Sequence, residues 1–286
     1  MSKKRKVCSI VIFSVILVAL LAGIFIIGIP GPKEESIQEV MKDAVLHESI
    51  KIDLFGLMQV NPAVISAFVV TGIFIVFALI VRIFVIPKFT IVPGKFQMVL
   101  ETAVSIFSNM AKSNSPHKNG FIGAYAFAAG AYIFVGTLFE LIGIQAVSVS
   151  GLSVSLPAPL ADINGAIAMG VLTYSVILVG GIIHNGFRGF INGIKEFSLP
   201  ISMSFRLFGA LLSGALVTEL VYYTMMLSFV LPVIVGVLFT LIHALIQAYV
   251  LTTLATVFYG EVTEPPKKKE KKIKKSKKNN KTQVEA

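Results

Sequence analysis

The sequence contains no tryptophan, a single cysteine and few charged residues, and each scarcity excludes something. One cysteine, Cys8, cannot form an internal disulfide or a cysteine-based metal cluster. Without tryptophan, anchoring at a membrane interface depends on tyrosine, phenylalanine and basic residues. Charged residues make up 14% of the chain and apolar residues 55%, whereas soluble domains are about 25% charged and about 45–50% apolar. A water-soluble fold cannot bury so much apolar surface.

Long apolar runs determine the fold class. Several runs exceed about 18 residues, the length that crosses a hydrocarbon core of about 30 Å as a helix. Because backbone amides find no water in lipid, only helices or closed barrels span it. Barrel strands alternate polar and apolar residues, and these runs do not alternate. The sequence therefore predicts an all-α, polytopic helical membrane protein with about six membrane-embedded helices.

Four regions follow one another along the chain. Residues 1–32 hold either a membrane anchor or a cleavable signal-like span; the apolar run 7–29 is longer than a typical signal core, which favours the anchor. Residues 33–60 form an acidic, amphipathic external segment, and residues 263–286 a lysine-rich, disordered cytoplasmic tail. Residues 61–262 form the core. Within it we expect spans at about 62–86, 121–144 and 161–184, an interfacial helix within 89–118, a basic loop at 184–190, and two long helices within 199–260 divided near Pro232.

The formal net charge of +10 lies mostly in the tail, which carries ten lysines and two glutamates from Lys267 onward. The tail has no aromatic residues and is attached to a membrane body, so it indicates contact with anionic lipid and no nucleic-acid binding. The other basic segments are the N-terminus, 82–118 and 188–195, and the remaining connections are acidic or uncharged. By the positive-inside rule, both termini are expected in the cytoplasm.

Arg206 is the most informative charged residue, because a charge in mid-membrane costs about 2.5–3.5 kcal/mol on insertion scales. It lies within the apolar run "LPISMSFRLFGALLSGALV". On a helix it shares one stripe with small residues, which let another helix approach closely and keep the guanidinium away from lipid. These residues are Ser202, Gly209, Ala210 and Ser213. The alternative is a structural ion pair, or an arginine that reaches the interface.

Two polar groups lie one turn apart on the following helix, at His243 and Gln247. His243 can titrate near neutral pH, although a histidine that is hydrogen-bonded within the packing is an equal alternative. Gln247 lies either against a mobile partner or within the packing. Glu219 lies thirteen residues after Arg206, on another face, and has either a proton-path role or a structural one.

Two carboxylates flank one external loop. Glu140 ends one predicted span and Asp162 begins the next. Together they would line an aqueous funnel, but a carboxylate at a membrane edge is often merely solvated, and Asp162 also suits a helix N-cap. The chain has no glycine-rich phosphate loop and no histidine or cysteine metal spacing, so no nucleotide, cofactor or metal is expected.

The segment around Arg206 resembles the a subunit of F-type ATP synthases. "SFRLFGALLSGALV" is similar to that family's "SLRLFGN" signature around an essential arginine, and "LIQAYVLTTLATVFYGE" to its final-helix "IQAYVF" pattern. In order, "VPGKFQMVLE", "FELIGI" and "LADINGAIAMG" also resemble family segments, so the similarity covers roughly 52–261. Ala210 and Ala215 depart from the family, which usually has asparagine and often an acidic residue there; Glu219 is the candidate substitute for the latter.

The resemblance implies a stator subunit of the membrane sector, not catalytic alone, that translocates an ion, expected to be a proton, across the cell membrane. Its partners would be a rotor ring of c subunits, each carrying one carboxylate, peripheral-stalk b subunits, other synthase subunits and lipid. Arg206 would be the essential arginine, Gln247 its polar neighbour and Glu140 part of the external half-channel, with the last two helices forming a long inclined hairpin. The alternatives are a self-contained secondary transporter, which usually shows internal repeats that we do not find, and a membrane scaffold or assembly protein.

Overall fold

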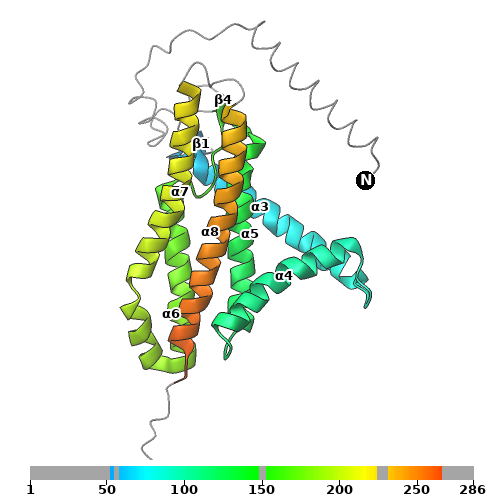
Figure 1. Ribbon diagram of the computed structural model, residues 1–286, viewed down its shortest axis with the longest axis vertical. Helices are drawn as coiled ribbons and strands as arrows, with labels where there is room; N and C mark the ends of the chain where they lie inside the picture. Colours follow the sequence, from blue (N-terminus) through cyan, green and yellow to red (C-terminus); the bar gives the residue numbers. More distant parts are fainter. Residues whose placement is uncertain (1–51, 55–57, 148–152, 224–230, 266–286) are drawn as a thin grey trace, which may run out of the picture.

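The computed structural model describes residues 52–54, 58–147, 153–223 and 231–265 (Figure 1). The predicted anchor, most of the predicted external segment and the lysine-rich tail lie outside these residues. Two short antiparallel strand pairs join β1 (Ile52–Leu54) to β2 (Met58–Val60) and β3 (Gln145–Val147) to β4 (Ser153–Ser155). The α-helices are α3 (Pro62–Ile80), α4 (Lys95–Asn114), α5 (Gly120–Ile142), α6 (Ile163–Lys195), α7 (Ser198–Tyr223) and α8 (Leu231–Thr263).

Four of these helical stretches are long and apolar enough to cross a membrane, counting only the described residues. They are Pro62–Lys88, Gly120–Ile142, Ile163–Lys195 and Gly236–Thr263. The helical membrane fold predicted from the sequence is thereby confirmed. The 33 residues of α8 extend about 50 Å at 1.5 Å per residue. Because this exceeds a hydrocarbon core of about 30 Å, the length of α8 favours an inclined helix.

Helices α5 to α8 lie side by side and enclose the main core, while α3 leaves this bundle obliquely (Figure 1). The core is made of side chains from all four bundle helices, such as Ile133, Ile177, Leu207 and Leu251. Glycines allow the closest approaches. The ring of Tyr259, 2% exposed, fills the space that a side chain on Gly180 would occupy. Such small-residue contacts replace the hydrophobic effect as the source of helix association in lipid.

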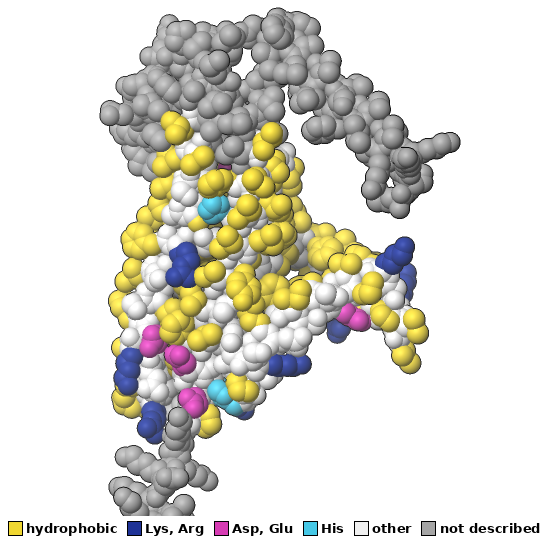
Figure 2. Space-filling model, in the orientation of Figure 1, with side chains coloured by type: hydrophobic (Ala, Val, Ile, Leu, Met, Phe, Trp, Pro, Cys, Tyr) yellow, Lys and Arg dark blue, Asp and Glu magenta, His cyan; other side chains and the backbone are white. Residues whose placement is uncertain are grey.

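Polar side chains close the end of the bundle at which α8 finishes. The Asn185 side chain donates to the carbonyl oxygens of Val262 and Glu264, both at 2.9 Å, and so caps α8. The α4–α5 connection lies at the same end, where His117 bonds the Thr263 hydroxyl at 3.0 Å. Lys and Arg side chains gather at this end and at the α3–α4 tip (Figure 2).

The chain does turn within the predicted basic loop at 184–190, but the turn is confined to Gly186 and the residues on either side of it are helical, so α6 is a tight hairpin of two helices. The helix breaks at Gly186, which has φ 56° and ψ −138°, a backbone conformation open essentially only to glycine. Beyond the break the chain runs back along itself, with Gly189 against Gly181 and Gly193 against Leu178. The Tyr174 hydroxyl donates to the Gly193 carbonyl at 3.1 Å. Packing between residues on the two sides of the turn stabilises this reversal of the chain, and local composition does not reveal it.

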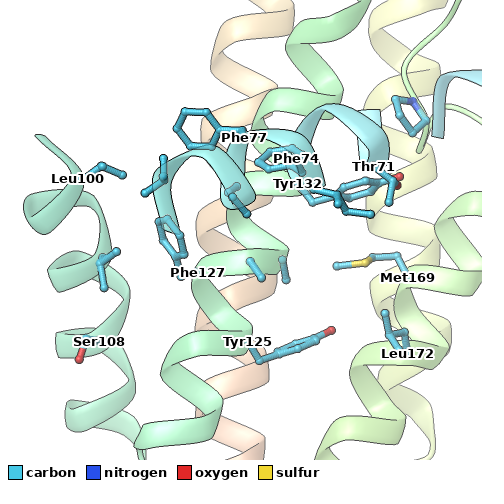
Figure 3. A pocket seen from close by; sticks show the side chains of 18 of the residues that line it. Thr71, Phe74, Phe77, Leu100, Ser108, Tyr125, Phe127, Tyr132, Met169 and Leu172 are labelled. Carbon is cyan, nitrogen blue, oxygen red and sulfur yellow. The ribbon is translucent and has the colours of Figure 1, made fainter. Parts of the chain in front are cut away.

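Helix α3 is packed only near its beginning. Its buried residues are Pro62, Ala63, Ser66 and Val70, and none follows in the π-helical turn Val81–Val85 or the 3-10 turn Ile86–Lys88 that end this span. Beyond that point a cavity of about 1190 Å³ separates α3 from α4, α5 and α6. Phe74, Phe127 and Tyr132 point into it (Figure 3). Its lining is apolar apart from a few polar groups, so it does not suit an ion path.

Candidate functional site

Arg206 lies on the face of α7 that is turned away from the core. Its side chain is exposed, whereas Met203 and Leu207, on the other face, are buried. The small stripe predicted from the sequence shares the outward face: Ser202, Gly209 and Ser213 are exposed and Ala210 is half-buried. Among the side chains that the structure describes, no carboxylate lies within ion-pairing distance of Arg206. The guanidinium therefore faces outward, and the described residues give the structural ion pair no support.

Gln247 lies directly behind Arg206, at the middle of α8. Its side chain is 6% exposed, and its Nε2 donates to the main-chain oxygen of Arg206 at 3.3 Å. The Oε1 atom is buried and has no hydrogen-bond partner in the described part of the chain. A buried acceptor without a partner is costly, so this oxygen favours a nearby N–H donor. The two residues that the sequence paired as neighbours are thus brought together.

His243 lies one turn before Gln247 and is half-buried. Its Nδ1 lies 3.0 Å from the carbonyl oxygen of Phe239, and its ring stacks on that of Phe239 with centroids 4.9 Å apart. Its own helix therefore fixes the ring plane. This geometry is compatible with both roles that the sequence left open for His243, a titrating group or a histidine that is hydrogen-bonded within the packing.

The external carboxylates lie at the same end of the bundle but have separate partners. Glu140, in the last turn of α5, is exposed and accepts a hydrogen bond from the backbone of Ala158. Asp162 is the N-cap of α6 and accepts from the Asn164 backbone N–H at 2.6 Å, as the capping interpretation predicted. A crevice of about 310 Å³ between α3 and α6 is lined by Asp162, and Glu140 is not part of that lining. Glu219 belongs to α7, but its side chain lies outside the described residues.

Asn61 is a polar residue that the sequence reasoning missed. It is the N-cap of α3, and its Nδ2 donates to Asp162 Oδ2. An available signal was its place before Pro62, since an asparagine N-cap followed by proline at the first helical position marks a helix start. No local signal shows that it contacts Asp162, 101 residues later.

Comparison with known proteins gives consistent results. A family model described as "ATP synthase A chain" matches residues 64–260. ATP synthase subunit a of Histophilus somni (strain 129Pt) is 28% identical over 196 residues, covering 58% of this chain and 73% of the relative. The same subunit of strain 2336 is 27% identical over the same shares, and that of Glaesserella parasuis serovar 5 (strain SH0165) is 26% identical over 194 residues. Since the family model matches more than half of the chain, this protein belongs to the ATP synthase A chain family and is a membrane subunit of the ATP synthase.

Proposed function

We propose that this chain is the ion-translocating stator of the membrane sector, with Arg206 facing a carboxylate on each passing subunit of a rotor ring. The observation that carries the proposal is the outward position of Arg206 on the small-residue face of α7. A guanidinium that faces lipid is unfavourable, but the small residues beside it let a helix of another subunit approach closely and meet the charge. The buried amide of Gln247 supports the Arg206 backbone from behind.

The mechanism follows from electrostatics. An opposite charge within about 4–6 Å favours the ionised form of a carboxyl group, so an acid of the ring releases its ion on arriving at Arg206. An ionised carboxylate cannot enter lipid cheaply, so it must take up an ion from a second aqueous path before it moves on. Arg206 also blocks direct leakage between the two paths. Each ion that falls through 100 mV releases about 2.3 kcal/mol, which appears as rotation.

The remaining polar residues belong to this proposal as linings of the two half-channels. Glu140, at the external end, lines the external half-channel, and Glu219 and His243 extend it toward Arg206. Asp162 is left out, because both of its oxygens have partners within the chain. The translocated ion is a proton, the partners include c and b subunits, and the chain lies in the cell membrane with both termini in the cytoplasm.

The partner of the α7 face can be identified by photocrosslinking. In a Cys8→Ser background, single cysteines at Ser202 and Ser213 are labelled with a benzophenone maleimide in the assembled complex and irradiated. A cysteine at Ile73 serves as the matched control, since Ile73 is also exposed but lies on α3, across the bundle from α7 (Figure 1). Mass spectrometry should find the hairpin subunit of the ring joined to positions 202 and 213 only. Adducts with lipid alone, or equal adducts from position 73, would contradict the proposal.

Gln247→Leu should lower pumping without reducing the amount of assembled complex. Leucine has a similar volume, and it removes a buried oxygen that has no described partner, so the fold loses little. The Arg206 carbonyl, however, loses its donor from α8. A hydrogen bond between neutral groups contributes about 0.5–1.5 kcal/mol, so ATP-driven pumping should fall by about two- to tenfold. Thr252→Val is the control, because Thr252 is also buried on α8 but bonds only its own helix.

A further inference from the structure

Asn61 and Asp162 form a reciprocal pair that caps two helices at once. Asn61 Oδ1 accepts from the backbone N–H of Ala63 at 3.1 Å, which caps α3, and Asn61 Nδ2 donates to Asp162 Oδ2. The other oxygen of Asp162 accepts from the backbone N–H of Asn164, which caps α6. Both oxygens of the carboxylate and both polar atoms of the amide therefore have partners. We refer to Asn61 and Asp162 as the α3–α6 latch.

The latch lies at the start of α3, beside the part of this helix that packs on the bundle. All buried residues of α3 lie within nine residues of Asn61. Farther along the helix, beyond the contact of Phe74 with Tyr132, the apolar cavity lies between α3 and the rest of the bundle (Figure 3). Apolar contact alone gives little association in lipid, so close packing and hydrogen bonds between helices must supply it. The direct side-chain bond between α3 and α6 in the described residues is that of the latch.

The latch uses both oxygens of Asp162 as hydrogen-bond acceptors. Helix N-termini carry partial positive charge, and two of them meet at this carboxylate. Both carboxylate oxygens are thus engaged by N–H donors of this chain, one from each helix start, which suits a structural contact between α3 and α6.

We propose that the α3–α6 latch fixes the position of α3 on α6, so that Asp162 is a positioning residue and not a proton carrier. This role goes beyond the proposed ion translocation and does not depend on it. It predicts that donor and acceptor can be exchanged. With Asn61→Asp and Asp162→Asn together, the new carboxylate at position 61 would cap α3. The new amide at position 162 would cap α6 through its oxygen and donate to position 61 through its nitrogen.

Each single substitution should break the hydrogen bond between positions 61 and 162, whereas the double substitution should keep it. Asn61→Asp places two carboxylate oxygens against each other, and Asp162→Asn places two amide donors against each other. In purified complex with Cys8→Ser, spin labels at Ile73 on α3 and Val171 on α6, both exposed, report the separation of the helices by double electron–electron resonance. Both single variants should broaden this distance distribution and lower the unfolding midpoint by about 2–4 °C. The double variant should restore both.

ATP-driven pumping separates the latch from a proton carrier. The latch predicts that Asp162→Asn retains the pumping rate per assembled complex, despite its altered α3 geometry. Loss of pumping in a normally assembled Asp162→Asn complex would overturn the proposal. So would unchanged label distances in both single variants, or a double variant no better than either single one. Should the single variants fail to assemble, recovery of assembly by the double variant supports the latch and its absence refutes it.

Discussion

Arg206→Ala should abolish ATP-driven ion pumping in membrane vesicles while the complex still assembles. Assembly should survive because Arg206 is exposed and pairs with no described carboxylate, so its removal leaves no hole and no unpaired charge in the bundle. Pumping should fail because no fixed cation remains to draw the ion from the ring carboxylate. Removing a preorganised charge-stabilising donor typically costs about 10²–10³ in rate, and at least this loss is expected here.

Two further variants sharpen this result. Arg206→Lys keeps the charge but loses the planar fork of donors, so it should rescue only a small part of the pumping. Arg188→Ala is the matched control, because it removes an exposed arginine from the hairpin within α6, ten residues before α7 begins. It should pump normally. Normal coupled pumping by Arg206→Ala would refute the proposed mechanism, and loss of assembly would point to a scaffolding role.

The spans were predictable because the sequence marks their ends. Pro62 and Pro87 bound the first described span, which the structure places at 62–88, and Asp162 begins α6 as an N-cap. The division of the last apolar region near Pro232 is confirmed, since α8 begins at Leu231. The α7 stripe was predictable for a similar reason. A helical period of 3.6 residues places small residues and Arg206 on one face whatever the tertiary structure.

The remaining features depend on contacts between distant residues. The fold-back after Gly186 needs Gly181 and Gly189 to meet across a turn, and the local sequence reads equally well as a loop. The latch joins residues 101 positions apart, and no periodicity connects them. The role of Arg206 depends on a carboxylate of another polypeptide. This chain supplies only the α7 face that the carboxylate would meet, so the proposed ion transfer cannot be predicted from this sequence alone.

Gly189→Ala should destabilise the subunit, because a methyl group there would meet the main-chain carbonyl of Gly181. A backbone atom cannot move aside by changing rotamer, so the hairpin within α6 would have to open. Overpacking costs about 1–3 kcal/mol when side chains can adjust, and the cost here should reach the upper end of that range. The amount of subunit in membranes and its unfolding midpoint in detergent would both fall.

Gly72→Ala is the matched control, since nothing lies within 4 Å of the added methyl group on α3. It should be neutral or stabilise by about 0.5–1 kcal/mol, because alanine is the better helix former. The contrast has a functional consequence. The second half of α6 leads directly into Ser198 at the start of α7, so opening the hairpin would displace the helix that carries Arg206. Gly189→Ala complexes that do assemble should therefore pump poorly, whereas equal stability and pumping of the two variants would show that the hairpin does not position α7.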